Sequence, residues 1–570
     1  MNQKIKKTLP IIILAILTCL YFFNIIISKN FLWEDFPVFY FPLKSYVFNS
    51  LKQGQIPLWN PNLNLGYPII ADTTAAIFYP LNWLAVPFAS GNIQKDYLII
   101  ELWTIFHLFL AGVFMYYLVD YLTQENTKTR KHENNETQKQ ENEKLNIPPF
   151  HKEGLLGGFG WDVINPAALF AAIAFMFSGF FIGHLKHVAQ ITTACWLPLI
   201  FLFLYKSFKE KKYSYAIYAG IFWGVSVLSG HLQIVYHFSF FLGLFILWEI
   251  IYNFAERKNY KKIIVCSLAA IIIAISLSSV QILPFLEFLK TSTRNEVSQG
   301  FASSFSLKPS EFIINLFFPH AFGGFKPNSL YFGYGGAFWE TAVYVGILTL
   351  IFILIAIIKS WNKNSLIFFL IFSSAFCLCL AFGGYFFVHP LLLNIMPGLS
   401  MIRAPARFVL PVIFSFCVLA GFGFNYFCDF LKKFNNKINT KLFFAGLIFL
   451  LFFDMFLFGW QFNNGTIKPN KYYPQFADRF GGAAEPVRKL RIINDDYLMP
   501  NSAYIYNMPT MDSNHYMMIK DYYNFTNGLS ENLYYQNKFR DFNNFFKNKT
   551  RLNLLGIKYI ISKRDLSKWF

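Results

Sequence analysis

The sequence predicts an all-α, polytopic membrane protein with a large first outer loop and a small C-terminal α/β domain outside the membrane. Three observations carry this prediction. The 570 residues are 55% hydrophobic and only 14% charged, whereas soluble domains carry about 25% charged residues. Apolar runs close to the roughly 20 residues that cross a bilayer recur along the chain, about eleven in all. Basic residues gather in alternate connections between these runs.

The predicted spans follow one another from the N-terminus. They cover residues 9–28, 99–122, 166–183, 190–205, 214–229, 232–252, 263–285, 341–358, 365–383, 406–428 and 441–461. The first run is longer than the apolar part of a signal peptide and lacks a small-x-small cleavage site, so we interpret it as a span. No internal repeat is visible, which argues against a transporter built of inverted repeats.

The distribution of Lys and Arg predicts the orientation. Lys4, Lys6 and Lys7 precede the first span, and basic segments at 128–131, 206–212, 256–262, 359–363 and 431–437 fall on the same side. Short basic loops stay in the cytoplasm, so we place the N-terminus inside. The net charge of +19 is then a signal of topology, and we expect no nucleic-acid partner.

The predicted domains follow from these spans. Residues 1–461 form the transmembrane domain, with outer loops at 31–98 and 286–340. Residues 123–150 are polar and charged, which is typical of a disordered cytoplasmic insert. Residues 462–570, which we call the tail, alternate short apolar runs with Asn and Asp turns. This pattern predicts a small mixed α/β domain, extracytoplasmic if the chain has eleven spans.

Two adjacent carboxylates, Glu34 and Asp35, stand directly after the first span in a loop rich in aromatic residues and proline. Ionisable groups at a membrane are costly and point to function. Asp35 is the candidate general base, because a carboxylate beside an acceptor hydroxyl can take its proton; the alternative is a helix N-cap. Glu34 is either its catalytic partner or a solvated neighbour.

Arginines supply candidate phosphate ligands. Arg403 and Arg407 lie four residues apart in MIRAPARF, and guanidinium groups match phosphate oxygens and can stabilise a lipid-phosphate leaving group. The alternative is that both arginines reach to lipid headgroups. Arg294 is a third candidate.

Further polar side chains stand at span ends that are predicted to face outside, and we expect them to line a cleft that binds sugar or acceptor. They are Asp72, His184, His187, Gln190, His231, Gln233 and Glu340. The alternative for each is that span ends tolerate polar groups. The spacing of His184 and His187 could serve a metal, but no third ligand is evident. We therefore expect no cofactor, with a divalent metal as the alternative. The seven cysteines form no disulfide framework.

Several runs together resemble one bacterial family. They are GQIPLWNPNLNLGYPIIAD…FYPLNWL, FSGFFIGHLKHVAQITTACWLPLIFL, SGHLQIVYH, MIRAPARF and LNLLGIKYIIS. In this order the chain resembles the YfhO-type membrane proteins over most of its length, the insert 123–150 excepted. That family is similar to the GT-C glycosyltransferases, multi-span enzymes that take a sugar from a polyprenyl-phosphate donor on the outer face. An acidic residue of the first outer loop is the usual base in such enzymes, which maps onto Asp35, with Glu34 beside it.

The resemblance implies a GT-C-like glycosyltransferase in the bacterial inner membrane. Its partners would be a polyprenyl-phosphate-linked sugar, membrane lipid, and an acceptor that is an envelope glycan, a teichoic acid-like polymer or a lipid. Two other classes of function are open. A transporter or flippase of lipid-linked saccharide would also need many spans, but it should carry ionisable residues near mid-span. A non-catalytic envelope-assembly protein would tolerate loss of Asp35.

Overall fold

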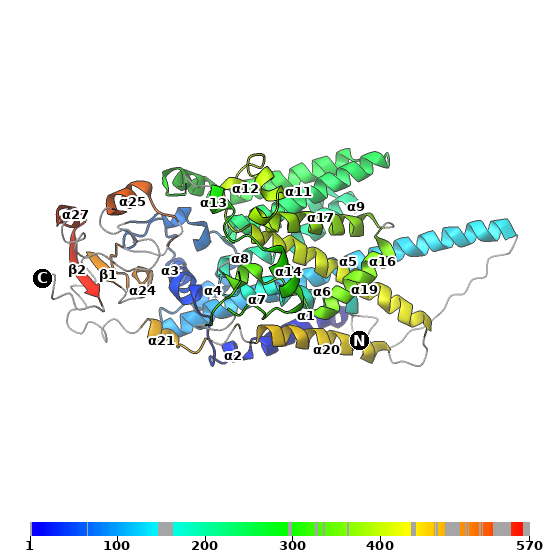
Figure 1. The fold of residues 1–570 in the computed structure, drawn as a ribbon, viewed down its shortest axis with the longest axis horizontal. Coiled ribbons are helices and arrows are strands. Elements are labelled where there is room, and N and C mark those ends of the chain that lie inside the picture. Colours follow the sequence, from blue (N-terminus) through cyan, green and yellow to red (C-terminus); the bar gives the residue numbers. More distant parts are fainter. Residues whose placement is uncertain are drawn as a thin grey trace.

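The computed structural model describes residues 3–64, 66–145, 164–294, 299–324, 329–333, 337–361, 364–434, 440–460, 462, 465–473, 491–495, 499, 501–511, 515, 517–527 and 549–562. The long helices lie side by side along the longest axis of the molecule (Figure 1). The C-terminal elements gather at one end of this bundle, and the long helix α5 projects from the other end. We call the end with the C-terminal elements the site end, because the candidate site described below lies there.

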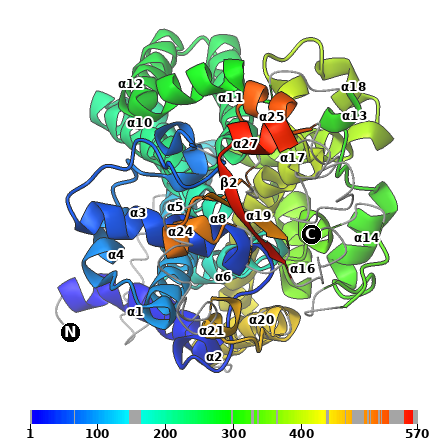
Figure 2. The same cartoon turned by 90° about the vertical axis from the view of Figure 1, so that its left-hand side faces the viewer.

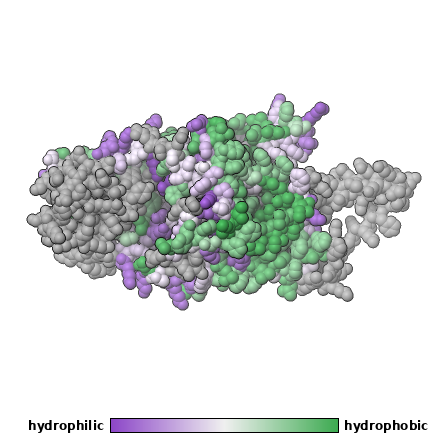
Figure 3. Space-filling view, viewed as in Figure 1, coloured by the Kyte–Doolittle hydropathy of each residue, from purple (hydrophilic) through white to green (hydrophobic). Residues whose placement is uncertain are grey.

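Seven helical segments are long and apolar enough to cross a membrane. They are Ile93–Lys128, Pro166–Gly183, Val188–Lys209, Leu232–Ala255, Lys261–Thr291, Pro405–Leu431 and Thr440–Gly459. Four shorter apolar helices lie at Thr8–Tyr21, Tyr213–Leu228, Ile347–Ser360 and Ser365–Ala381. Together these overlap all the predicted ranges. On the face drawn in Figure 3, hydrophobic side chains gather over part of this helical region. The chain is a membrane protein, while the number of spans stays a prediction.

The helices of the bundle have the following bounds: α1 (Gln3–Tyr21), α5 (Ile93–Leu145), α6 (Pro166–Met176), α7 (Gly179–Gly183), α8 (Val188–Ala194), α9 (Leu197–Lys209), α10 (Tyr213–Leu228), α11 (Leu232–Ala255), α12 (Lys261–Thr291), α16 (Ile347–Ser360), α17 (Ser365–Ala381), α19 (Val409–Phe434) and α20 (Thr440–Gly459). Shorter helices occupy the connections: α2 (Phe23–Ile26), the π-helix η1 (Phe36–Tyr40), α3 (Phe41–Lys52), η2 (Ile69–Ala71), η3 (Thr73–Ala75), α4 (Asn82–Ala85), η4 (Val86–Phe88), α13 (Gln299–Ala302), α14 (Pro309–Phe317), α15 (Phe338–Thr341), η5 (Gly383–Tyr385), α18 (Val388–Leu392), η6 (Leu399–Met401) and η7 (Pro405–Phe408).

Helix α5 differs from the prediction in its second half. The polarity of residues 123–150 predicts a disordered insert, but α5 continues as a helix to Leu145, and residues 146–150 lie outside the described range. The physical reason is composition. Residues 123–145 contain no Gly or Pro and are rich in Glu, Lys and Gln, which have high helix propensity despite their polarity.

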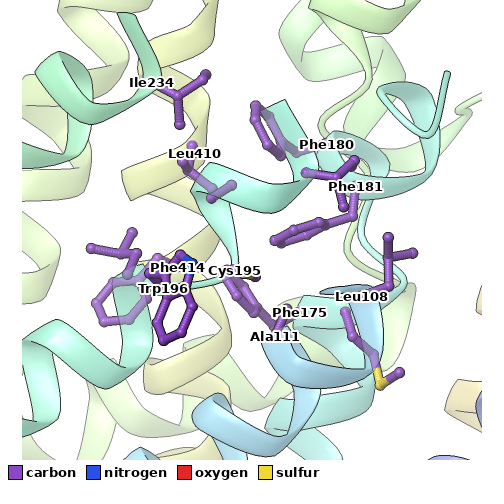
Figure 4. Packing of buried hydrophobic residues seen from close by; sticks show 14 of the residues in the cluster. Leu108, Ala111, Phe175, Phe180, Phe181, Cys195, Trp196, Ile234, Leu410 and Phe414 are labelled. Atoms are coloured by element: carbon purple, nitrogen blue, oxygen red, sulfur yellow. The ribbon is translucent and has the colours of Figure 1, made fainter. Parts of the chain in front are cut away.

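Helix α6 forms the centre of the bundle. Its sequence PAALFAAIAFM is apolar on every side, the pattern of a helix buried all round. Its alanines let α5 and α19 approach closely. Phe175 packs edge-on against Phe181 at 5.0 Å between ring centroids and against Phe414 of α19 at 6.2 Å (Figure 4). This rigid core carries the helix ends that form the site.

The helical chain breaks repeatedly at the site end. Helix α6 ends at Met176, and the short α7 ends before a turn at residues 184–187 that leads into α8. At the first break the amide of Gly179 donates to the carbonyl of Tyr344 at 2.7 Å. A Cβ at Gly179 would lie 2.5 Å from the carbonyl oxygen of Ala342, so only glycine permits this approach. The breaks place polar side chains such as His184, Lys186 and His187 in the turn, where they are buried against other segments.

The tail contains a two-stranded parallel sheet of β1 (Arg491–Asp495) and β2 (Ile557–Ser562). Its described helices are α21 (Pro469–Tyr472), α24 (Ala503–Tyr506), α25 (Lys520–Asn527) and α27 (Lys549–Leu554). Figure 2 shows these elements across the site end, with α24 beside α3. The amide of Thr510 donates to the Asn62 carbonyl at 2.7 Å, and that of Thr293 to the Met518 carbonyl at 2.9 Å. The tail is thus joined to the first loop and to the segment after α12.

Candidate active site

Asp35 is paired with a histidine from a distant part of the chain. Nε2 of His187 donates a hydrogen bond to Oδ2 of Asp35 over 3.1 Å. The two side chains differ in exposure: Asp35 is 46% exposed and His187 only 7%. Asp35 precedes the π-helix η1 without capping it through its side chain. Its carboxylate therefore faces the open side of the site, with the imidazole behind it.

The charges of this pair follow from their surroundings. Burial lowers the pKa of His187 to about 4, against the opposing effect of Asp35. Burial by itself raises the pKa of Asp35, but the hydrogen bond and charge of His187 and the charge of Arg403 outweigh it, and the net pKa is lowered. At neutral pH the pair is a carboxylate that accepts from a neutral imidazole. A carboxylate in this state can accept a proton.

Glu34 contacts a lysine that the sequence analysis did not select. Lys186 donates from Nζ to Oε2 of Glu34. The same Nζ lies over the rings of Trp339, Trp33 and Phe338, at 3.7, 4.8 and 5.0 Å from their centroids. Burial lowers the pKa of Lys186 to about 6, while Glu340 acts to raise it. Below this pH, aromatic faces stabilise the Lys186 ammonium that has lost its water.

The backbone at Glu34 is strained. Its φ of 60° is a left-handed conformation that residues other than glycine adopt rarely and mostly where function requires it. The contact with Lys186 holds this turn, and Asp35 is the next residue.

A signal for Lys186 was present in the sequence, because it is a basic residue between two histidines in a connection predicted to lie outside, where basic residues are scarce.

Arg407 and Glu340 form a buried pair. Nε of Arg407 donates to Oε1 and Oε2 of Glu340 at 3.1 and 3.0 Å, and Nη2 donates to Oε1 at 2.5 Å. Nη1 donates to Oε1 of Gln233 at 2.9 Å. Nε2 of His184 is 3.6 Å from Oε2 of Glu340. Burial raises the pKa of Glu340, but Arg407 and His184 more than reverse this and hold it well below its usual range.

Arg403 differs from Arg407 in its contacts. Its guanidinium lies over the ring of Phe305 at 5.5 Å from the centroid. The side chain is partly exposed, and its charge lowers the pKa of Asp35. Gln233 donates from Nε2 to the Arg403 carbonyl, so this amide links the two arginines. Of the two, Arg403 has the side chain open to solvent beside the Asp35 carboxylate.

His231 and Gln190 complete the polar end of the bundle. His231 accepts at Nδ1 from the amide of Ile234 at 3.2 Å and caps α11. Burial lowers the pKa of His231, and the charge of Arg407 lowers it further. Gln190 is 2% exposed, and its Oε1 has no hydrogen-bond partner among the described residues. Nδ1 of His187, one turn earlier, also has none within that range. Two acceptors without a partner among the described residues thus lie three residues apart at the start of α8.

Asp72 lies in a closed network. It is 1% exposed and accepts from the amide and hydroxyl of Thr74 and from the hydroxyl of Tyr67, the last at 3.2 Å. Its Oδ2 is 3.1 Å from Nδ1 of His515, and both side chains are 0% exposed. Burial raises the pKa of Asp72, but His515 and Thr74 outweigh it, so the net pKa is lowered. Asp72 binds the tail to the first loop.

We expect Asp72→Asn to loosen the tail. The exchange removes a charge-assisted contact with His515, which costs about 2 kcal/mol of docking free energy. Because the pKa of Asp72 is lowered, the wild-type contact persists at neutral pH and is lost only as the pH falls below the usual range of aspartate. The measurement is the rate at which trypsin releases the tail from purified protein. An unchanged rate relative to Asp521→Asn, an exposed position on α25, would contradict the assignment.

The structure brings together most of the residues selected from the sequence. Hydrogen bonds, ion pairs or mutual charges link nine of them: Glu34, Asp35, His184, His187, His231, Gln233, Glu340, Arg403 and Arg407. Arg294 instead lies over the ring of Phe301, 4.7 Å from its centroid. Among the described residues, no three His, Cys, Asp or Glu side chains are grouped to hold a metal ion.

The chain is a membrane protein, and its likeness to a solved structure supports the GT-C-like fold that the sequence resemblance predicted. No protein-family model and no curated protein matches the sequence. Solved structures match by fold. One match is the structure of the Archaeoglobus fulgidus oligosaccharyltransferase tethered with an acceptor peptide containing the NVT sequon via a disulfide bond. The match covers 98% of this chain and 70% of the oligosaccharyltransferase chain, with a TM-score of 0.52 and 13% identity.

A second match is the structure of ArnT from Cupriavidus metallidurans bound to undecaprenyl phosphate. It covers 95% of this chain and 92% of that chain, with a TM-score of 0.46 and 12% identity. At such identity the likeness concerns the fold alone. The chemistry of this chain has to be argued from its own residues.

Proposed function

We propose that this protein is an integral-membrane glycosyltransferase of YfhO type. It transfers a sugar from a polyprenyl-phosphate donor to an envelope glycan, a teichoic acid-like polymer or a lipid. The observation that carries the proposal is the half-exposed carboxylate of Asp35, held ionised by His187 and Arg403 at the broken helix ends of a GT-C-like bundle. The oligosaccharyltransferase that shares the fold indicates that such a bundle can serve glycosyl transfer.

The proposed reaction inverts the anomeric carbon. The acceptor hydroxyl gives its proton to Asp35 while its oxygen attacks the anomeric carbon. The bond from that carbon to the phosphate oxygen breaks, and the lipid phosphate leaves with the electron pair. Arg403 stabilises the charge on the leaving phosphate. His187 holds the carboxylate in place through its Nε2–H.

The other residues have supporting roles in the proposal. Gln190 and Nδ1 of His187 are unused acceptors, and they accept hydrogen bonds from sugar hydroxyls. Glu340 fixes Arg407, and Gln233 joins Arg407 to the Arg403 backbone. Asp72 keeps the tail over the site through His515. If the N-terminus is cytoplasmic, a site at this end of the bundle faces the outside of the membrane. No nucleotide donor is available on that side, so the transfer requires a lipid-linked sugar.

The test compares envelope glycans by mass spectrometry in cells that lack the protein and in cells complemented with the wild type. We expect the deletion to remove a sugar and the wild type to restore it. Purified protein should also release polyprenyl phosphate from a polyprenyl-phosphate sugar when the acceptor is present. If the glycans change but purified protein releases no lipid phosphate, the transporter or assembly functions replace the transferase.

A further inference from the structure

Tyr40 places an unused hydroxyl at the candidate site. The side chain is 6% exposed, and its ring stands edge-on to that of His187 with 6.3 Å between centroids. Its hydroxyl makes no hydrogen bond with another described residue. The hydroxyl oxygen is not one of the fully buried polar atoms that lack a partner, so it stays within reach of solvent while the rest of the side chain is buried. An unpaired donor beside the Asp35–His187 pair is therefore available to a ligand.

The backbone explains why Tyr40 lies near Asp35. Residues 36–40 form a π-helix, in which the amide of Phe41 donates to the carbonyl of Phe36, five residues earlier. In an α-helix, with about 3.6 residues per turn, residues five apart point to nearly opposite sides. The wider π-turn brings Tyr40 back towards the side of Asp35. Such turns are frequent at functional sites.

The tail maintains this turn. An α-helix would use the carbonyl of Pro37 for the amide of Phe41, but Tyr473 donates its hydroxyl to that carbonyl instead. Asn501 donates from Nδ2 to the carbonyl of Val38 at 3.2 Å. Two tail side chains thus bind carbonyls of the π-turn, which stabilises the orientation of Tyr40.

Four charges act on the Tyr40 hydroxyl. Burial and the nearby Asp35 raise its pKa, Arg407 lowers it, Asp72 raises it and Arg403 lowers it, with a net increase. The hydroxyl therefore keeps its proton at neutral pH and is a donor. Arg407 is bound by Glu340 and Asp72 by His515. The charges that face the open side are those of Asp35 and Arg403.

We propose that Tyr40 is a binding residue of this site and donates its hydroxyl hydrogen to a phosphate oxygen of the lipid donor, beside Arg403. The inference rests on the proposed function and deepens it by naming a neutral phosphate ligand. A phenol suits this position, because it contacts the anion without adding a second positive charge that would compete for Asp35. The hydroxyl remains bound to the phosphate when the sugar leaves.

The test measures binding of undecaprenyl phosphate and undecaprenol to the full-length protein in detergent, by native mass spectrometry. The two lipids differ only in the phosphate. We expect Tyr40→Phe to weaken binding of undecaprenyl phosphate by about 10- to 100-fold, the range for a lost hydrogen bond to a charged group. Binding of undecaprenol should stay unchanged. The control is Tyr46→Phe on the adjoining α3, whose ring packs against Tyr504.

The outcomes separate this inference from the proposed function. If wild type prefers undecaprenyl phosphate over undecaprenol and Tyr40→Phe keeps the same preference, Tyr40 does not bind phosphate. Equal loss of both lipids in Tyr40→Phe would mean a damaged fold and would also overturn the inference. If wild type shows no preference for the phosphate, the lipid-phosphate donor itself is refuted, and the role of Tyr40 with it.

Discussion

Asp35→Asn should abolish sugar transfer while leaving the protein folded and in the membrane. The amide has the shape of the carboxylate but cannot accept a proton from the acceptor hydroxyl. Loss of a general base lowers kcat by about 10²- to 10⁴-fold. His187 still has a hydrogen-bond acceptor in the Asp35→Asn variant, because the new amide oxygen can replace Oδ2. Stability should therefore change much less than activity.

The neighbouring carboxylate is the matched comparison. Glu34→Gln keeps the left-handed turn and a polar contact for Lys186, so we expect a decrease in kcat of about tenfold or less, through displacement of Asp35. Asp521→Asn, an exposed change on α25, should leave kcat unchanged. The readouts are release of polyprenyl phosphate in vitro and restoration of envelope glycans in the deletion strain. Full restoration by Asp35→Asn at normal expression would falsify its role as the base.

The pH dependence of the wild type has a defined sign. His187 and Arg403 lower the pKa of Asp35 against the effect of burial, so the base is ionised throughout the neutral range. The rate should fall only as the pH drops through the lowered pKa, below the usual range of aspartate. Burial keeps the pKa of His187 at about 4, so the imidazole stays neutral above that pH. A rate that halves near pH 6 to 7 would point to another group as the base.

Glu340→Gln should be the most destabilising single substitution at the site. Removing one partner of a buried ion pair leaves the other charge uncompensated, which costs about 3–5 kcal/mol. Glu340 is 3% exposed and the Arg407 side chain 9%, so water cannot replace the lost carboxylate. His184 loses its contact as well. We expect a large decrease in the yield of folded protein and in the Tm in detergent.

A double-mutant cycle isolates the pair from the general effect of substitution. Arg407→Gln should destabilise by a similar amount, and the double variant Glu340→Gln/Arg407→Gln by less than the sum, because no buried charge remains unpaired. The control is Lys212→Met, which removes the exposed Glu210–Lys212 pair and should leave Tm unchanged. Additive losses in the double variant would show that the two side chains do not act as a pair.

The sequence predicted the helices of the bundle and the end at which polar residues gather. Every predicted span overlaps a helix, because the apolar run needed to cross a membrane is a local property of the chain. The boundary of the span predicted at 341–358 was wrong by several residues: α16 begins at Ile347, after Gly346, whose φ is 90°. The polarity of residues 123–150 predicts disorder, but residues 123–145 are helical, because polar residues such as Glu, Lys and Gln have high helix propensity.

Only the tertiary structure decided which side chains are partners. Asp35 and His187 are 152 residues apart in the chain, and Arg407 and Glu340 are 67 apart. No local pattern links such positions, because the pairing depends on which spans pack together. It also depends on the helix breaks, which direct residues 184–187 and 337–346 towards the site. Lys186 and Tyr40 entered the site for the same reason. The sequence by itself determined that the chain is a membrane bundle with polar groups at one end, since hydrophobicity and charge act locally. Packing alone could determine that Arg407 is bound by Glu340, that Asp72 is bound by the tail, and that Asp35 is left facing the open side.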